Sequence, residues 1–181
     1  PEGTALVRAG NAAGASALAL VIEQGVVART GLAPKGEVIL AGAGPGDPEL
    51  ITMAARAVLA DADVVLHDAL IDPRVLGLCG PRTRLVDVGK RAGRPSITQA
   101  EINDLMIDAA IAGDLVVRLK GGDPFLFGRG GAEVDALQQA GIPVRVIPGV
   151  SAALAAPAAA GIPVPHRDVA ASVAVCPRPR A

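Results

Sequence analysis

The sequence predicts an α/β fold, an open parallel sheet with helices on both of its faces. The first observation is a set of five short apolar runs, which are strand candidates at residues 38–41, 64–67, 85–88, 115–119 and 144–147. The second is that longer, helix-like segments separate these runs. Strands that are apolar at nearly every position indicate a sheet covered on both sides, and their alternation with helices indicates parallel pairing.

The helix candidates are the segments 49–60, 98–112, 131–140 and 151–160. The second of these has the clearest beginning, because Thr98 is followed three residues later by Glu101, the spacing of a capping box. Residues 172–175 are apolar again and predict the opening strand of a further domain. In a parallel sheet the loops after the strands collect at one edge, and ligands bind there.

The two ends of the chain differ in character from the segment between them. An alanine-rich stretch at residues 11–24 predicts a short helix, and Gly31, Pro34 and Gly36 predict a linker after it. We therefore expect an N-terminal helix and linker over residues 1–35 and an α/β domain over residues 36–170. Residues 171–181 are expected to be the truncated start of a second domain that is otherwise missing.

Composition excludes several classes of partner for this chain of 181 residues. Its 17 basic and 18 acidic side chains leave a net charge of −1, and it has neither Trp nor Tyr, so we expect no nucleic acid. No apolar run approaches the ~18 residues of a membrane span, so we expect no membrane. Cys79 and Cys176 are far apart, which fits a reducing cytoplasm and excludes a thiolate zinc site, so no metal is expected.

The loop after the first strand candidate is Gly-Ala-Gly-Pro-Gly-Asp-Pro at residues 42–48. Together with Asp68 after the second strand, it suggests a dinucleotide-binding turn. However, Asp47 occupies the third glycine position, where its charge would face a pyrophosphate, and Pro45 lacks a backbone donor. Asp47 is better interpreted as a helix cap, so a nicotinamide cofactor is the weaker alternative.

The loop after the fourth strand candidate, residues 121–130, combines glycines with an acid, an arginine and both phenylalanines. Its adjacent glycines would let the backbone approach a ligand, and Asp123 would accept hydrogen bonds from an amine or hydroxyl. The simpler alternative is a loop that its phenylalanines anchor to the core. After the fifth strand, Ser151 is either a helix cap or a ligand contact.

Ionisable side chains also follow the second and third strand candidates. His67 and Asp68 follow one strand, and Lys90 and Arg91 follow the other. Singly, such residues are usually solvated or capping. Their expected convergence at one edge of the sheet makes them site candidates, with His67 either a titrating neighbour of Asp68 or incidental.

Four segments, taken in order and with their spacing, resemble the tetrapyrrole methylase family over residues 36–175. They are Gly-Ala-Gly-Pro-Gly-Asp-Pro, Val-Gly-Lys-Arg-Ala-Gly, Val-Val-Arg-Leu-Lys-Gly-Gly-Asp-Pro-Phe-Leu-Phe-Gly-Arg-Gly-Gly and Ala-Gly-Ile-Pro-Val-Pro-His-Arg. The resemblance implies two α/β domains with S-adenosylmethionine between them, of which this chain covers the first, and a homodimer. It implies methyl transfer to ring carbons 2 and 7 of uroporphyrinogen III, giving precorrin-2 for sirohaem or cobalamin, with S-adenosylhomocysteine as the other product.

The same resemblance assigns roles to individual residues. It implies that Asp68 is the proton acceptor and Lys90 the proton donor. Substrate carboxylates would be met by Arg91, Arg129 and Arg167, since bidentate arginine pairs are strong and directional. The residues expected to contact S-adenosylmethionine are Pro45, Gly121, Gly122, Asp123, Leu126, Ser151 and Ala152.

The sequence also departs from the family pattern around these positions. His67 and Ala69 stand where the family usually has Tyr and Arg around the catalytic Asp. Three other positions that usually carry a polar side chain are Ala54, Ala132 and Ala159. These losses keep open a binding module without catalysis. A methylase of a later corrin intermediate is a further alternative, since the glycine loops would serve either substrate. Residues 1–35 resemble the end of the dehydrogenase and chelatase module that precedes such a methylase in bifunctional sirohaem synthases.

Overall fold

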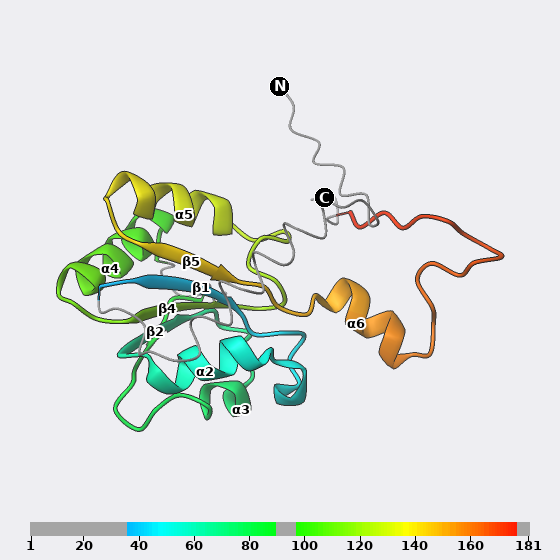
Figure 1. Cartoon of the computed structure of the whole chain (residues 1–181), viewed down its shortest axis with the longest axis horizontal. Coiled ribbons are helices and arrows are strands. Elements are labelled where there is room, and N and C mark those ends of the chain that lie inside the picture. The colour runs from blue at the N-terminus through cyan, green and yellow to red at the C-terminus, as the bar shows by residue number, and fades with distance from the viewer. Residues whose placement is uncertain (1–35, 90–96, 177–181) are drawn as a thin grey trace, which may run out of the picture. The chain divides into compact units, whose positions relative to one another are not determined.

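The computed structural model describes residues 36–89 and 97–176 of the chain. Within these ranges the backbone forms one five-stranded sheet, in which the strand order is β3-β2-β4-β1-β5 and every pair is parallel (Figure 1). The strands are β1 (Val38–Gly42), β2 (Val64–His67), β3 (Arg84–Asp87), β4 (Val116–Lys120) and β5 (Val144–Ile147). All five predicted strands are confirmed, and no boundary differs by more than one residue.

Helices cover both faces of the sheet, which confirms the predicted fold class (Figure 1). On one face lie α4 (Gln99–Ile111) and α5 (Gly130–Gln139), and on the other lie α2 (Met53–Asp61) and the short α3 (Pro73–Leu76). A further helix, α6 (Ala152–Ala159), follows β5 and has no buried residue. The strands point toward α6, so the loops after them gather at that edge.

The first predicted helix is wrong at its beginning. Instead of starting near residue 49, the chain forms a 3-10 turn, η1 (Pro48–Leu50), which Asp47 caps by accepting the Glu49 N–H at 3.1 Å. The backbone then extends, and Thr52 caps α2 by accepting the Ala55 N–H at 3.1 Å. Sequence periodicity ran the two elements together. The capping role of Asp47 is confirmed, whereas α3 was not predicted because four residues carry no periodicity.

The capping box of α4 is confirmed in both directions. The Thr98 hydroxyl oxygen accepts the Glu101 N–H at 3.2 Å, and the Glu101 carboxylate accepts the Thr98 N–H at 2.6 Å. Residues 172–175 pair with no strand in the described chain. An apolar run needs a neighbouring backbone to become a strand, so the opening strand expected there, cut off before it can pair, stays a prediction. The helix and linker predicted at residues 11–24 and 28–36 fall almost wholly outside the described residues.

The central strands of the sheet are buried on both faces, whereas the edge strand β3 is not. Every residue of β1 and β4 is buried, while β3 at the edge is mostly exposed. Leu40 of β1 packs in one cluster with Met106 of α4 and Leu137 of α5. Because β4 lies between β1 and β2, the loops after these three strands lie side by side at the edge where a site is expected.

Candidate active site

The loops after β1, β4 and β5 meet at a corner built from glycine. The Gly44 N–H donates to the Gly122 carbonyl at 3.3 Å, and the Gly122 N–H donates to the Gly44 carbonyl at 2.8 Å. A Cβ atom on Gly42 would lie 2.5 Å from the Gly122 oxygen, and one on Gly149 would lie 2.1 Å from it. Three backbones therefore come together at this corner only because none of them carries a side chain.

Two polar side chains hold this corner in place. The Asp123 carboxylate accepts the Phe125 N–H at 2.9 Å and the Gly149 N–H at 3.1 Å, which ties the loop after β4 to the loop after β5. The Ser151 hydroxyl caps α6 by accepting the Ala153 N–H at 3.2 Å. Of the two interpretations of Ser151, capping is confirmed. The cofactor contacts expected of Asp123 and Ser151 stay predictions.

A cavity of about 180 Å³ opens at the glycine corner. Four of the seven residues predicted to contact the cofactor line it: Pro45, Gly121, Gly122 and Ala152. A Cβ atom built on Gly46 or Gly121 would meet no atom within 4 Å, so their backbones face open space. A ligand can therefore approach the main chain closely here, as glycine-rich loops allow.

A larger cavity of about 410 Å³ adjoins the first. Its lining includes Asp68, Gly89, Gly121, Asp123, Leu126 and Arg129, which come from the loops after β2, β3 and β4. Leu70, Ile71 and Gly121 line both cavities and form their common wall. The structure thus brings the predicted proton acceptor and one predicted substrate arginine next to the predicted cofactor wall.

Two predicted residues of the described chain, Arg167 and Ser151, line neither of the two cavities. Arg167 is exposed, and its contact with substrate stays a prediction. Lys90 and Arg91 lie outside the described residues. The rim of the larger cavity on the β3 side is represented by Val88 and Gly89.

Asp68 is fixed from the protein side and open to the cavity. The Arg118 Nη2 donates to Asp68 Oδ1 at 2.5 Å, with the Arg118 side chain 3% exposed and the Asp68 side chain 37% exposed. The neighbouring His67 places its Nδ1 at 3.1 Å from the Asp68 backbone oxygen rather than from the carboxylate. Asp68 therefore has a buried cation beside it, and both Asp68 and Arg118 line the larger cavity.

The charges behind Asp68 form a buried network that sequence reasoning missed. Arg118 Nε donates to Glu133 Oε1 at 3.2 Å, and Lys120 Nζ donates to Glu133 Oε2 at 2.9 Å. Glu133 is fully buried in α5 and also accepts from Gln99 Nε2 of α4 at 3.2 Å. The available signal was a pair of cations at alternate positions of a buried strand, which places both on the same face.

Three of the alanines that depart from the family pattern lie on the surface, so no buried polar group loses a partner through them. Ala54, Ala132 and Ala159 are all exposed. Ala69 packs against Gly89 so closely that a Cβ atom on Gly89 would lie 2.3 Å from the Ala69 Cβ. The first three positions could therefore hold a polar side chain without repacking, and their loss concerns what the surface contacts.

Asp72 lines the smaller cavity and was not singled out from the sequence. Its carboxylate accepts the Arg74 Nε at 3.1 Å and the Arg74 Nη2 at 3.0 Å. Hydrogen bonds from the Arg74 side chain, then from the Arg74 backbone N–H, hold the pKa of Asp72 below its ordinary value. Elsewhere, burial raises the pKa of the Cys79 thiol, which favours its neutral form.

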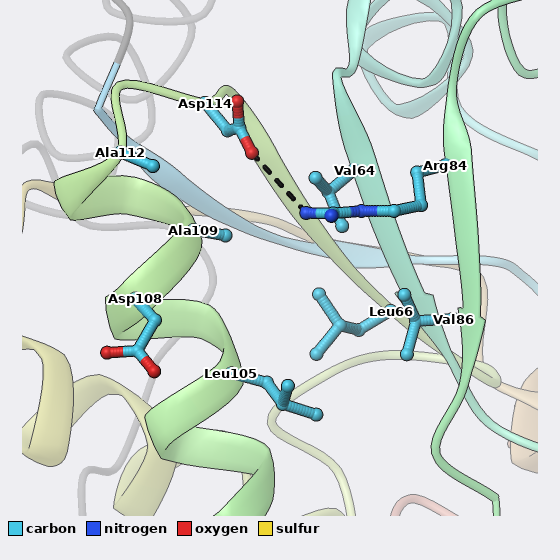
Figure 2. A pocket seen from close by; sticks show the side chains of 9 residues that line it. All are labelled: Val64, Leu66, Arg84, Val86, Leu105, Asp108, Ala109, Ala112 and Asp114. Carbon is cyan, nitrogen blue, oxygen red and sulfur yellow. Dashed lines mark hydrogen bonds and ion pairs between the residues drawn. The ribbon is translucent and has the colours of Figure 1, made fainter.

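A third cavity, of about 430 Å³, lies between α4 and strands β2 and β3, away from the site (Figure 2). Its walls are mainly apolar, with Leu66 and Val86 facing Leu105, and an Arg84–Asp114 ion pair of 3.5 Å closes one end. None of the described residues predicted for the site lines it. Its size alone therefore does not make it the functional cavity.

Within residues 36–89 and 97–176, no group of three or more His, Cys, Asp or Glu side chains is placed to hold a metal ion. None of the helices in that part of the chain is long and apolar enough to cross a membrane.

Known relatives match the region that carries both cavities. The family model described as Tetrapyrrole (Corrin/Porphyrin) Methylases matches residues 37–181. Uroporphyrinogen-III C-methyltransferase of Methanocaldococcus jannaschii is 53% identical over 140 residues, which are 77% of this chain and 58% of that protein. Siroheme synthase 2 of Aeromonas hydrophila is 54% identical over 137 residues, which are 76% of this chain and 29% of that protein.

A solved structure agrees with these matches in both sequence and fold. Uroporphyrin-III C-methyltransferase from Thermus thermophilus, complexed with S-adenosylhomocysteine, superposes with a TM-score of 0.64 and 49% identity. The match covers 75% of this chain and 56% of that one, so the chain spans little more than half of this relative. The family model and the level of identity together show that the chain belongs to the tetrapyrrole (corrin/porphyrin) methylase family.

Proposed function

We propose that this protein transfers methyl groups from S-adenosylmethionine to carbons 2 and 7 of uroporphyrinogen III, giving precorrin-2 for sirohaem or cobalamin synthesis. One observation carries the proposal: two cavities share the wall formed by Leu70, Ile71 and Gly121. Methyl transfer needs the donor and the acceptor side by side in a fixed orientation. The names of the relatives support the choice of substrate.

The smaller cavity fits one part of S-adenosylmethionine. Its volume of about 180 Å³ is below the roughly 300 Å³ at which small-molecule pockets begin, so these residues form only part of a site. When bound, the cofactor supplies an electrophilic methyl group on a sulfonium. We assign its contacts in this chain to Pro45, Gly121, Gly122, Asp123, Leu126, Ser151 and Ala152. The part of the relatives that this chain does not span would complete the wall.

The larger cavity would hold the acceptor ring. A pyrrole carbon would form a bond to the methyl group as the bond between that methyl group and sulfur breaks, with S-adenosylhomocysteine as the leaving group. The methylated ring then gives up a proton to a base. Asp68 is the proposed base, because its carboxylate opens into this cavity and Oδ2 makes no hydrogen bond to any residue of the described ranges. Lys90 is the proposed proton donor. We assign the substrate carboxylates to Arg129, Arg91 and Arg167.

Assembly, compartment and domain division are part of the same proposal. We expect a homodimer, by resemblance to the family, and a reducing cytoplasm, since Cys79 and Cys176 are both free thiols. Residues 36–170 would be the first methylase domain and residues 171–181 the beginning of the second. Residues 1–35 would end a preceding module.

A binding module without catalysis is the competing candidate, favoured by the alanines at positions 54, 132 and 159. The deciding experiment joins this chain to the part of the Methanocaldococcus jannaschii relative that it does not span, giving an extended protein. The extended protein is supplied with uroporphyrinogen III and methyl-labelled S-adenosylmethionine. Incorporation of two methyl groups supports the proposal, whereas cofactor binding without incorporation supports the binding module. Incorporation only into a later corrin intermediate would change the substrate.

The chain by itself is predicted to bind S-adenosylmethionine weakly. Part of the cofactor's surface would remain in water, while the loss of translational and rotational freedom on binding would be the same. Calorimetry should therefore give no saturation at micromolar cofactor with this chain and clear saturation with the extended protein. Micromolar binding by the chain alone would contradict the assignment of only half of the cofactor wall to it.

A further inference from the structure

We infer that Arg118 is a positioning residue for Asp68, and that Glu133 holds Arg118 in that position. The inference rests on the proposed function, because it takes Asp68 to be the base of that reaction. Its observation is independent of the function: a chain of ion pairs runs from the cavity surface at Asp68 through Arg118 to the buried Glu133 and Lys120.

Every nitrogen of the Arg118 guanidinium has a partner. Nη2 donates to Asp68 Oδ1, and Nε donates to Glu133 Oε1. Nη1 donates to two backbone oxygens, that of Leu66 at 3.3 Å and that of Leu119 at 3.2 Å. Since both carbonyls belong to the central sheet, the guanidinium cannot turn without breaking several bonds at once. Its direction, and with it the position of Asp68 Oδ1, is therefore set by the fold.

Glu133 is the anchor on the far side of Arg118. Its side chain is 0% exposed, and its two oxygens accept from Arg118, Lys120 and Gln99. The four charged members, two cations and two anions, balance. No buried side-chain polar atom in the described residues lacks a partner. Removing one of the three buried members, Arg118, Lys120 or Glu133, would leave a charge without its counterpart inside the domain, which is far more costly than losing a surface pair.

A buried network of this kind stabilises a fold only weakly, because taking the charges out of water offsets most of their attraction. Its effect on Asp68 is more specific. Arg118 binds Oδ1 and leaves Oδ2 for the substrate, so the base presents a single oxygen in a single direction.

The test compares the extended protein with its Arg118→Met and Arg118→Lys variants. Arg118→Met should lower kcat at least about tenfold and change KM by less than about twofold, because positioning of a base acts on the chemical step. Arg118→Lys should restore part of kcat, because it returns the charge without the guanidinium geometry.

Arg145→Met is the matched control. Arg145 also lies in a strand and pairs with a buried glutamate, Glu37, but outside both cavities. Its variant should keep the kcat of the parent. Equal kcat values in the Arg118→Met and Arg145→Met variants would overturn the inference. If Arg118→Met does not fold, Arg118→Lys decides alone, and an unchanged kcat in that variant overturns it.

A second measurement separates this inference from the proposed function. In the chain by itself, the Arg118 Nε–H should give a resolved, slowly exchanging NMR signal, because it is buried against Glu133. Asp68→Asn should move this signal, whereas Asp114→Asn, which alters a carboxylate paired with Arg84, should not. An Arg118 signal that ignores Asp68→Asn would overturn the coupling even if methyl transfer is observed. A signal that moves would support it even if methyl transfer is absent.

Discussion

The two sides of the candidate site are built in opposite ways. On the side of β1 and β5, Gly42, Gly122 and Gly149 let backbones touch and leave a wall of main-chain atoms. On the side of β2, the wall is a carboxylate that buried charges on β4 and α5 hold in place. The first side can fit a ligand by shape and backbone hydrogen bonds, and the second can accept a proton. Substitutions on the two sides should therefore fail in different ways.

The largest expected effect concerns chemistry and belongs to the charged side. Asp68→Asn in the extended protein should lower the rate of methyl transfer by about 10²- to 10⁴-fold, because the amide cannot accept the ring proton. Thermal unfolding of the variant should change little by comparison, since the Asp68 side chain is partly exposed.

Asp114→Asn is the matched control for this prediction, because Asp114 is a carboxylate paired with an arginine at the opposite end of the sheet. It should leave the rate unchanged. A loss of activity no greater in Asp68→Asn than in Asp114→Asn would remove Asp68 from the proposed mechanism.

The next largest effect concerns stability and belongs to the glycine side. Gly149→Ala places a methyl group 2.1 Å from the Gly122 oxygen, a backbone atom that cannot move without separating the loops. Overpacking of this kind costs about 1–3 kcal/mol, so urea unfolding of the chain should shift to lower concentration. Cofactor affinity of the extended protein should fall with it.

Gly131→Ala sharpens this comparison, because its added Cβ atom would meet nothing within 4 Å and the residue lies in α5. Alanine should be neutral or stabilising there by up to about 1 kcal/mol. Equal unfolding midpoints for Gly149→Ala and Gly131→Ala would mean that the glycine corner tolerates an added methyl group, against the close packing described above.

The smallest expected effect is on stability and concerns the N-terminal cap of α4, which lies outside the candidate site. Hydrogen bonds from the Thr98 backbone N–H, and then from its hydroxyl, hold the pKa of Glu101 below its ordinary value. A carboxyl with a lowered folded-state pKa stabilises the fold above its unfolded pKa of about 4.3 and loses that effect as the pH falls through the folded value.

Glu101→Gln should therefore destabilise the chain slightly at pH 7 and much less near pH 3 (about one unit below the unfolded pKa). Urea unfolding at the two pH values measures the difference. In a Thr98→Ala background the effect at pH 7 should shrink. A penalty equally large at both pH values would show that the carboxylate charge does not matter to this cap.

The parallel sheet could be predicted from the sequence, because its strands are short, apolar and separated by helices. Parallel pairing then brings the loops after the strands to a single edge of the sheet. Asp68, Gly121 and Arg129 could be placed at one site for that reason. Boundaries set by local hydrogen bonds were harder, so Asp47 and Thr52 begin two elements where periodicity indicated one.

The network behind Asp68 could not be obtained in the same way. The strand prediction for β4 rested on its apolar residues and did not use Arg118 and Lys120. Nothing in the helical segment 131–140 distinguishes Glu133 from a surface residue. Their pairing depends on how far α5 lies from the sheet and on which face of β4 turns toward it, which are tertiary facts. A buried strand that carries cations at alternate positions needs an acidic partner on the facing helix.

A crystal structure of the extended protein with S-adenosylhomocysteine and a non-reactive uroporphyrinogen analogue would test the two-cavity assignment directly. The cofactor product should lie against Gly44, Gly121 and Gly122, with its sulfur toward the common wall and an acceptor carbon next to Asp68. A cofactor or tetrapyrrole seated in the cavity between α4 and Arg84, or an acceptor ring remote from Asp68, would contradict it.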